Sequence, residues 1–96
     1  MSRMDNLSNE RLAALAQSGD RDAADVLAHR FTRLTNKLAN KVNVHGYERG
    51  DKIAELRLGL LKAIQTYDHM RGASFWTYAR NCMWCDILNT MRVERN

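Results

Sequence analysis

Apolar residues recur along this chain at spacings of three and four, the period that places them on one face of an α-helix. The longest such stripe consists of Ala23, Leu27, Phe31 (or Leu34), Leu38 and Val42. A second stripe follows a loop that contains two glycines, and it consists of Ile53, Leu56, Leu60, Ala63 and Ile64. Both patterns favour helices that bury one face and expose the other.

Residues that start and stop helices stand at the edges of these stripes. Ser8, Asp20 and Ser74 carry side-chain oxygens suited to N-caps, and Asp51 opens the helix after the loop. Gly19 suits a helix C-terminus because glycine adopts the left-handed backbone cheaply. We therefore predict an all-α fold, a single compact domain of about four helices over residues 1–96, with helices near 8–18, 21–44, 51–67 and 74–91.

The composition agrees with an all-helical chain. The 96 residues include no proline and five glycines, so few positions interrupt a helix, and this length suits one domain. No apolar run is long enough to cross a bilayer. The N-terminus, with Asp5 and Glu10, does not resemble a signal peptide. We expect a cytoplasmic protein that does not bind membranes.

Basic residues gather in one stretch of this chain, whose formal net charge is +4. No acidic residue lies between positions 26 and 46, and four cations recur there at helical spacing: Arg30, Arg33, Lys37 and Lys41. Like charges at this spacing repel each other by a few tenths of a kcal/mol per pair. Either solvent or an anionic partner can offset the repulsion, and the pattern alone favours neither.

Cys82 and Cys85 have the Cys-x-x-Cys spacing of many metal and redox sites. A zinc site needs two further ligands, and the three histidines are scattered singly. We therefore predict no metal and no cofactor, and interpret the pair as small apolar side chains of a reduced protein. No clustered acid, base or nucleophile is present, so we also predict that the protein is not an enzyme.

Asp51 and Glu55 lie one helical turn apart, beside Arg57, Leu58 and Leu61. Charged residues next to exposed leucines fit either a solvated helix face or a surface on which a partner docks. The residues alone favour the solvated face.

Aromatic residues and a cation gather further along the chain: Tyr67, Arg71, Phe75, Trp76 and Tyr78. Aromatic rings stack on unpaired bases, and a guanidinium binds phosphate or base edges. One base–aromatic stack contributes about 1–3 kcal/mol, comparable with the few kcal/mol that extruding a base costs. The alternative is a place in the core, which we assign to Phe75, whereas we assign Arg71 and Tyr78 to DNA.

Several short motifs occur in a fixed order in the second half of the chain: Asp51, Glu55, Gly59-Leu60, Lys62-Ala63, Tyr67-Asp68, Arg71-Gly72, Phe75-Trp76-Thr77-Tyr78-Ala79 and Ile87. In this order and spacing the chain resembles the second conserved region of the sigma-70 family, which binds RNA polymerase and opens the promoter. Upstream, Leu7-Ser8-Asn9-Glu10 and Ala16-Gln17-Ser18-Gly19-Asp20 resemble the opening of alternative sigma factors.

The resemblance implies two binding surfaces. The first grips a coiled coil in the largest subunit of core RNA polymerase and would comprise Asp51, Ala54, Glu55, Leu56, Arg57, Leu58 and Leu61. The second binds the non-template strand of promoter DNA and would comprise Tyr67, Arg71, Trp76, Thr77, Tyr78 and Arg80, together with Arg30, Arg33, Lys37 and Lys41 along the phosphates. In the family, the tyrosine at the position of Tyr78 stacks on the flipped adenine of the −10 element.

The chain also departs from the family pattern. Ala54 and Leu56 replace a glutamine and a glycine, and Asn81 and Cys82 replace a tryptophan pair that supports the opened strand in primary sigma factors. Trp84 stands where the family tends to place a polar reader of duplex DNA. No segment matches the helix-turn-helix that reads the −35 element, so we expect either that a second polypeptide supplies it or that another activator directs the choice of promoter.

The predicted function is a sigma-like initiation subunit that binds core RNA polymerase and helps to recognise and melt the −10 element. The alternative is a phage- or plasmid-type regulator that occupies the sigma site without reading DNA. A third reading, a helical interaction module unrelated to transcription, stays open because a fold does not determine a function.

Overall fold

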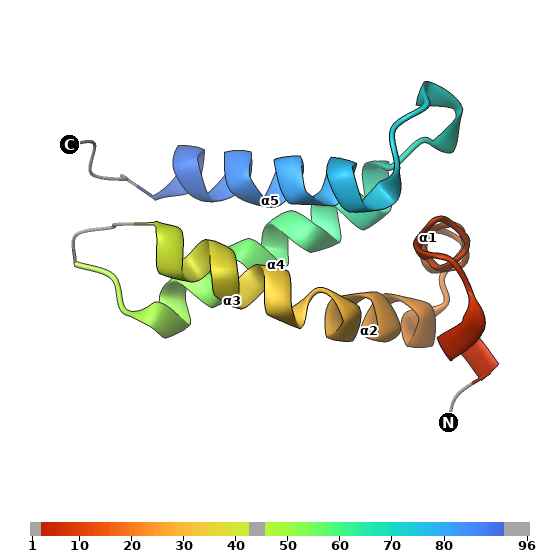
Figure 1. Ribbon diagram of the computed structural model, residues 1–96, viewed down its shortest axis with the longest axis horizontal. Helices are drawn as coiled ribbons and strands as arrows, with labels where there is room; N and C mark the ends of the chain where they lie inside the picture. Colours follow the sequence, from red (N-terminus) through yellow and green to blue (C-terminus); the bar gives the residue numbers. More distant parts are fainter. Residues whose placement is uncertain (1–2, 43–45, 92–96) are drawn as a thin grey trace.

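The computed structural model describes residues 3–42 and 46–91, and these residues form helices joined by short turns (Figure 1). The helices are η1 (Arg3–Asn6), α1 (Asn9–Gln17), α2 (Arg21–Arg30), α3 (Thr32–Lys41), α4 (Arg49–Thr66), η2 (His69–Arg71) and α5 (Phe75–Thr90). No strand occurs within the described ranges. The predicted all-α fold is confirmed, and the predicted helix end at Val44 lies outside the described residues.

Side-chain caps begin three of the helices where the sequence predicts. Ser8 Oγ accepts a hydrogen bond from the N–H of Arg11 (3.0 Å), and Asp20 Oδ1 accepts one from that of Ala23 (3.2 Å). Ser74 Oγ caps α5 in the same way and accepts a hydrogen bond from the N–H of Thr77 (3.2 Å). Each cap satisfies a backbone donor that the helix itself leaves without a partner.

The helix predicted over residues 21–44 is instead two helices, α2 and α3, which meet at Phe31. The ψ angle of Phe31 is 4°, far from the helical value of about −42°. Thr32 Oγ1 donates to the carbonyl of Ala28 (3.3 Å), and Thr35 Oγ1 donates to the carbonyl of Phe31 (2.8 Å). Hydrogen bonds from a hydroxyl to the carbonyl four residues back bend helices, which explains the break.

The core forms where the predicted apolar stripes meet. Phe75, whose core role the sequence predicts, is fully buried, and its ring meets those of Phe31 and Tyr67 edge-on, with centroids 5.6 and 5.2 Å away. Edge-to-face contacts are a favoured geometry for aromatic pairs. The largest fully buried side chains are Phe31, Phe75, Leu12, Leu27, Leu56, Leu60, Met83 and Ile87.

The helices α4 and α5 pack closely along their length. Gly59 is buried at their crossing, and a Cβ atom built there would lie 2.9 Å from Met83 Cα and 3.2 Å from Asp86 Cβ. Since real Cβ atoms do not approach a backbone atom so closely, only glycine permits this separation of the two helices.

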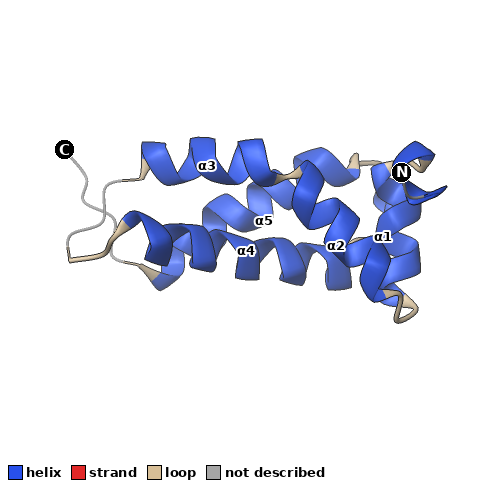
Figure 2. Ribbon diagram, turned by 90° about the horizontal axis from the view of Figure 1, so that it is seen from below, coloured by secondary structure: helices blue, strands red, loops and turns tan. Residues whose placement is uncertain are grey.

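The helices form an elongated bundle of 42 × 30 × 19 Å. The helices α2 and α3 follow one another end to end alongside α4, whereas α1 crosses one end of the bundle (Figures 1 and 2). The loop between α4 and α5 projects from the same end, beside α1 (Figure 1). The residues that the resemblance assigns to polymerase therefore lie on α4. Those that it assigns to DNA lie on the loop after α4, on α5 and, for the basic stripe, on α2 and α3.

Candidate functional site

The outer face of α4 carries most of the residues that the resemblance assigns to polymerase. Asp51, Ala54 and Arg57 are exposed, and the side chains of Leu58 and Leu61 are 50% and 46% exposed. Two half-exposed leucines bracketed by charged residues form an apolar patch with a polar rim, which is the anatomy of a protein interface. We call these five residues the α4 face.

Leu56 does not belong to this surface. Its side chain is fully buried in the core, so it cannot contact a partner, and the prediction of Leu56 as a docking residue is wrong. The physical reason is the helical period, since Leu56 shares the inward stripe with Leu60. Asp51 has a local role as well, because its Oδ2 accepts the N–H of Glu48 (3.0 Å) and completes a capping box. The N-cap of α4 is Glu48, so the prediction that Asp51 opens this helix is wrong by three residues.

Glu55 is half-buried at the edge of the α4 face, where α5 packs against it. A hydrogen bond shared with the carboxyl of Asp86 raises the pKa of Glu55 above its ordinary value, and burial acts in the same direction. Asp86 also forms an ion pair with Lys62, with Oδ1 and Nζ 2.6 Å apart. The sequence does not predict Asp86 as part of this site, because it lies on a different helix from Glu55.

A pocket of about 350 Å³ opens between the end of α4, the following loop and α5. Its lining consists of Thr66, Tyr67, Asp68, Arg71, Ala73 and Tyr78. We call it the aromatic pocket. The Arg71 side chain is 86% exposed and lies 3.8 Å from Asp68, so its guanidinium is available to a ligand. The Tyr78 ring is partly exposed, and its hydroxyl shares a hydrogen bond with Thr66 Oγ1 (2.7 Å).

Tyr67 contributes to the wall of this pocket but offers no free ring face. Its side chain is 9% exposed, and its hydroxyl donates to the carbonyl of Ala73 (2.7 Å). Burial raises the pKa of Tyr67, and the nearby carboxylates of Glu10 and Asp68 raise it further. The predicted stacking role of Tyr67 is therefore corrected to a supporting one, since its ring packs against Tyr78 at a centroid distance of 5.6 Å.

Two side chains of α1 fix the loop that carries the aromatic pocket. Gln17 Nε2 donates to the carbonyls of Ile64 (2.9 Å) and Tyr67 (2.8 Å) at the end of α4. Glu10 Oε2 accepts the N–H of Phe75 (2.6 Å) at the start of α5. Because these bonds satisfy backbone groups at both ends of the loop, α1 holds the pocket in shape. The sequence carries no local signal for such distant contacts.

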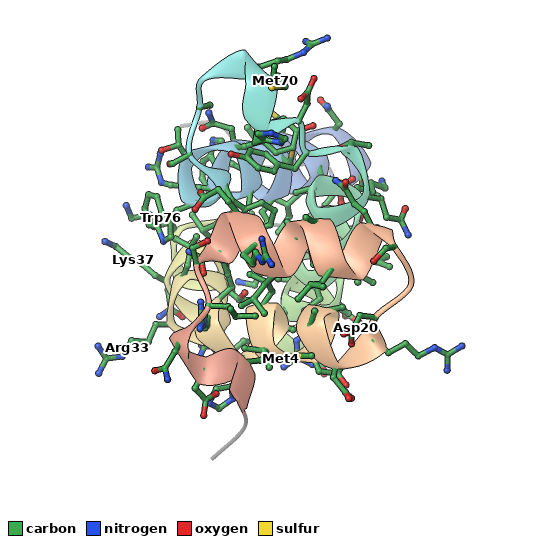
Figure 3. The ribbon with its side chains drawn as sticks, turned by 90° about the vertical axis from the view of Figure 1, so that its right-hand side faces the viewer. Met4, Asp20, Arg33, Lys37, Met70 and Trp76 are labelled. Carbon is green, nitrogen blue, oxygen red and sulfur yellow. The ribbon has the colours of Figure 1, made fainter. Side chains whose placement is uncertain are left out.

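A basic groove of about 350 Å³ runs between α3 and α5. Its lining comprises Arg30, Arg33, Leu34, Lys37, Leu38, Lys41, Trp76 and Arg80. The side chains of Arg33, Lys37 and Trp76 project on the same side of the molecule (Figure 3). The fold thus brings the basic stripe of α3 next to two residues of α5 that the sequence assigns to DNA. A cationic groove with an aromatic ring is the combination that holds single-stranded nucleic acid.

Arg30 lines this groove, but its guanidinium is used inside the protein. Nη1 donates to the carbonyl of Leu7 (2.7 Å) and to Asn9 Oδ1 (3.0 Å), and Nη2 donates to the carbonyls of Met4 (3.3 Å) and Asp5 (2.8 Å). These four bonds attach η1 and the start of α1 to α2. Four of its five N–H donors therefore already have partners within the protein, which leaves little of the guanidinium for the phosphate contact that the sequence predicts.

The groove continues along α5 past the predicted residues. A smaller hollow of about 220 Å³ is lined by Leu38, Lys41, Arg80, Asn81 and Trp84. Helical spacing explains this extension, since every fourth residue of α5 falls on the same side. Trp84 is not among the residues that the sequence predicts to bind DNA.

The two cysteines of α5 differ in their surroundings. Cys82 is partly buried and packs against the core, whereas Cys85 is exposed, and both are free thiols. Their interpretation as a pair of packed apolar side chains therefore holds for Cys82 alone. In the part of the chain that the structure describes, no helix is both long and apolar enough to cross a membrane.

The domain thus presents three surface features, which are an exposed helix face with two leucines, an aromatic pocket and a basic groove. No family model matches the chain. The chain is similar to the RNA polymerase sigma-28 factor of Bacillus thuringiensis subsp. kurstaki, with 33% identity over 79 residues, which cover 82% of this chain and 33% of that protein.

Two further relatives are also RNA polymerase sigma factors. RNA polymerase sigma factor RpoH of Rhizobium radiobacter is 38% identical over 69 residues, which cover 72% of this chain and 22% of that protein. The RNA polymerase sigma-H factor of Bacillus licheniformis is 26% identical over 87 residues, covering 91% and 39%. The chain spans less than two fifths of the length of these relatives. It therefore contains a region of the sigma-70 family.

Proposed function

We propose that this chain docks on core RNA polymerase through the α4 face and captures the non-template strand of promoter DNA in the aromatic pocket. It would act in the cytoplasm as a subunit of a transcription initiation factor that helps to melt the −10 element, by binding rather than by catalysis.

The observation that carries the proposal is the relation between the two surfaces. Tyr78 and Arg71 line a pocket at the end of α4, the same helix whose outer face exposes Leu58 and Leu61. A coiled coil bound to α4 would therefore hold the pocket in a fixed position over the DNA. One base stacked on Tyr78 contributes about 1–3 kcal/mol, enough to bias strand opening.

The basic groove gives the captured strand a path along the domain. Trp76 and Tyr78 are two residues apart on α5, which places them about 200° apart around the helix. The pocket and the groove thus lie on opposite sides of the first turn of α5, where Thr77 is exposed. A strand leaving Tyr78 would cross this turn at Thr77, and its phosphates would meet Lys37, Arg80 and their neighbours in the groove.

Transcription with core RNA polymerase of the host bacterium tests the proposal. The chain is added together with any polypeptide encoded beside it, and transcripts from their promoters are measured. We expect Tyr78→Ala to reduce promoter-specific transcription by roughly five- to 150-fold without weakening core binding, because it removes a stacking contribution of about 1–3 kcal/mol. Tyr78→Phe is the matched control, since it keeps the ring and loses only the bond to Thr66.

The outcomes separate the candidate functions. Transcription that is equally strong in Tyr78→Ala would overturn DNA capture by the pocket. A chain that binds core RNA polymerase and only inhibits transcription, to the same extent with Tyr78→Ala, would support a regulator that occupies the sigma site without reading DNA. Docking fails as a function if wild-type chain does not bind core RNA polymerase.

A further inference from the structure

A row of three residues on α4 faces α5 where the two helices cross. Glu55, Gly59 and Lys62 follow one another at spacings of four and three, which places them on one side of α4. The residue opposite on α5 is Asp86, whose Cβ would lie 3.2 Å from a Cβ built at Gly59. Because no side chain separates the helices at Gly59, the carboxyl group of Asp86 meets the side chains on both sides of this glycine.

One oxygen of Asp86 lacks the hydrogen that it needs. The side chain is nine-tenths buried, and its Oδ1 accepts a hydrogen bond from Nζ of Lys62 (2.6 Å). Its Oδ2 is buried as well, and no donor among the described residues bonds to it. Leaving a buried carboxylate oxygen without a donor is costly. Because Oδ2 is closed to solvent, the missing hydrogen has to come from a group inside the protein.

The neighbouring side chains leave one source for this hydrogen. The ammonium of Lys62 is bonded to Oδ1, and the hydroxyl of Thr90 forms a hydrogen bond with Glu55. The remaining group is the carboxyl of Glu55, which is half-buried and shares a hydrogen bond with the carboxyl of Asp86. Ionised carboxylates only accept hydrogen bonds, so two of them form such a bond only when one carries a proton.

We propose that Glu55 and Asp86 share one proton across the α4–α5 crossing, and that this proton holds the two helices together until rising pH removes it. We call these two residues the carboxyl pair. With the proton in place, the pair carries a single negative charge, which the ammonium of Lys62 balances. Without it, two carboxylates repel each other and Oδ2 of Asp86 has no donor. The pair joins the helix that carries the α4 face to the helix that carries Tyr78.

The shared proton makes folding depend on pH in one direction. The hydrogen bond with Asp86 raises the pKa of Glu55, and burial and charge repulsion by Asp86 add to the rise, whereas the Thr90 hydroxyl and the Lys62 ammonium act against it. A pKa that is raised in the folded state contributes stability that is complete below the ordinary glutamate pKa. This contribution is lost as the pH rises through the raised pKa, by at most about tenfold in the folding equilibrium constant per pH unit.

Urea denaturation of the full chain between about pH 4 and about pH 8 measures this dependence. Glu55→Gln is the decisive variant, because its amide can donate to Asp86 at every pH and does not titrate. We expect the folding equilibrium constant of Glu55→Gln, divided by that of the wild type, to rise several-fold from the acidic to the neutral end. Asp25→Asn, which removes an exposed acidic group of α2, is the matched control and should follow the wild type at every pH.

Carbon-13 NMR of the side-chain carboxyls observes the proton directly. In the wild type, Glu55 should titrate above its ordinary range. In Asp86→Asn, which keeps the shape of Asp86 and offers an amide donor instead of a second carboxyl, it should titrate closer to that range. Circular dichroism verifies that each variant is folded.

Two results would overturn the shared proton. One is an ordinary titration of Glu55 in the folded wild type, which needs no variant to be stable. The other is a folding equilibrium constant that changes with pH in the same way in Glu55→Gln and in the wild type. Neither measurement involves RNA polymerase or DNA, so either result leaves the proposed function untouched.

Discussion

Gly59 shows how a single residue sets the distance between two helices of the site. An alanine Cβ at this position would lie 2.9 Å from Met83 Cα, a backbone atom that cannot rotate away. We expect Gly59→Ala to lower the free energy of unfolding by about 1–3 kcal/mol, the usual cost of overpacking a core. This cost exceeds the gain of about 1 kcal/mol from the higher helix propensity of alanine. Urea denaturation followed by circular dichroism measures the change.

Gly50→Ala provides the control within the same helix. Gly50 is exposed on α4, and a Cβ built there meets no atom within 4 Å. The free energy of unfolding should stay the same or rise by up to about 1 kcal/mol, because only the backbone propensity changes. If the two alanine variants are equally stable, the close approach at Gly59 does not limit packing.

At the scale of residues, the sequence predicts what depends on near neighbours. The caps at Ser8, Asp20 and Ser74 follow local rules, and the structure confirms all three. Arg30 was assigned to DNA because it continues a basic stripe. Its partners belong to η1 and the start of α1, and a stripe carries no information about such distant acceptors.

The helix α1 acts as a unit that holds the loop between α4 and α5. Gln17 tests this role better than Glu10, because its amide bridges two carbonyls at the end of α4, whereas Glu10 accepts a single N–H. We expect Gln17→Ala to lower the free energy of unfolding by about 1–2 kcal/mol, since it leaves partly buried acceptors without a donor. Hydrogen exchange should also quicken for the amides of residues 67–74, which form the loop.

The control for this element is Gln65→Ala, which shortens an exposed glutamine of α4 by the same atoms. Its stability should change by less than about 0.5 kcal/mol, as for most surface substitutions. If the loop amides exchange at the same rate in Gln17→Ala as in Gln65→Ala, α1 does not hold the aromatic pocket in shape.

Elements were predicted well in type and less well in extent. The apolar stripe runs through Phe31 without interruption, so the pattern predicts one helix where the structure has two. The break depends on hydroxyl bonds of Thr32 and Thr35 to backbone carbonyls. Hydrophobic periodicity does not register these bonds, because Phe31 is buried in either geometry.

At the scale of the whole molecule, the fold sorts the candidate residues onto separate surfaces. The α4 face and the basic groove share no residue, and the groove is built by α3 and α5. The sequence supplied the members of each set through the family pattern and the basic stripe. It did not predict that Trp76 and Arg80 face the stripe of α3, because that relation depends on how α3 and α5 pack.

This separation predicts that docking and DNA binding can be weakened one at a time. The pair Leu58→Ser and Leu61→Ser removes the apolar part of the α4 face, so we expect weaker binding to core RNA polymerase, by about 1–2 kcal/mol for two half-exposed leucines. The pair Lys37→Ala and Lys41→Ala removes two groove cations. For DNA binding by the assembled complex, it should reduce the slope of log affinity against log salt concentration by roughly one to two.

Each pair should leave the other measurement unchanged, and the effects of all four substitutions together should be the sum of the two pairs, because sites that share no contacts act additively. Fluorescence anisotropy of the labelled chain gives the affinity for core, and a salt titration with an opened promoter fragment gives the slope. A groove pair that weakens core binding as much as the leucine pair would show that polymerase, rather than a DNA strand, occupies the basic groove. The positive charge of α3 would then serve an acidic surface of the enzyme, and the aromatic pocket would be the remaining candidate contact with the opened strand.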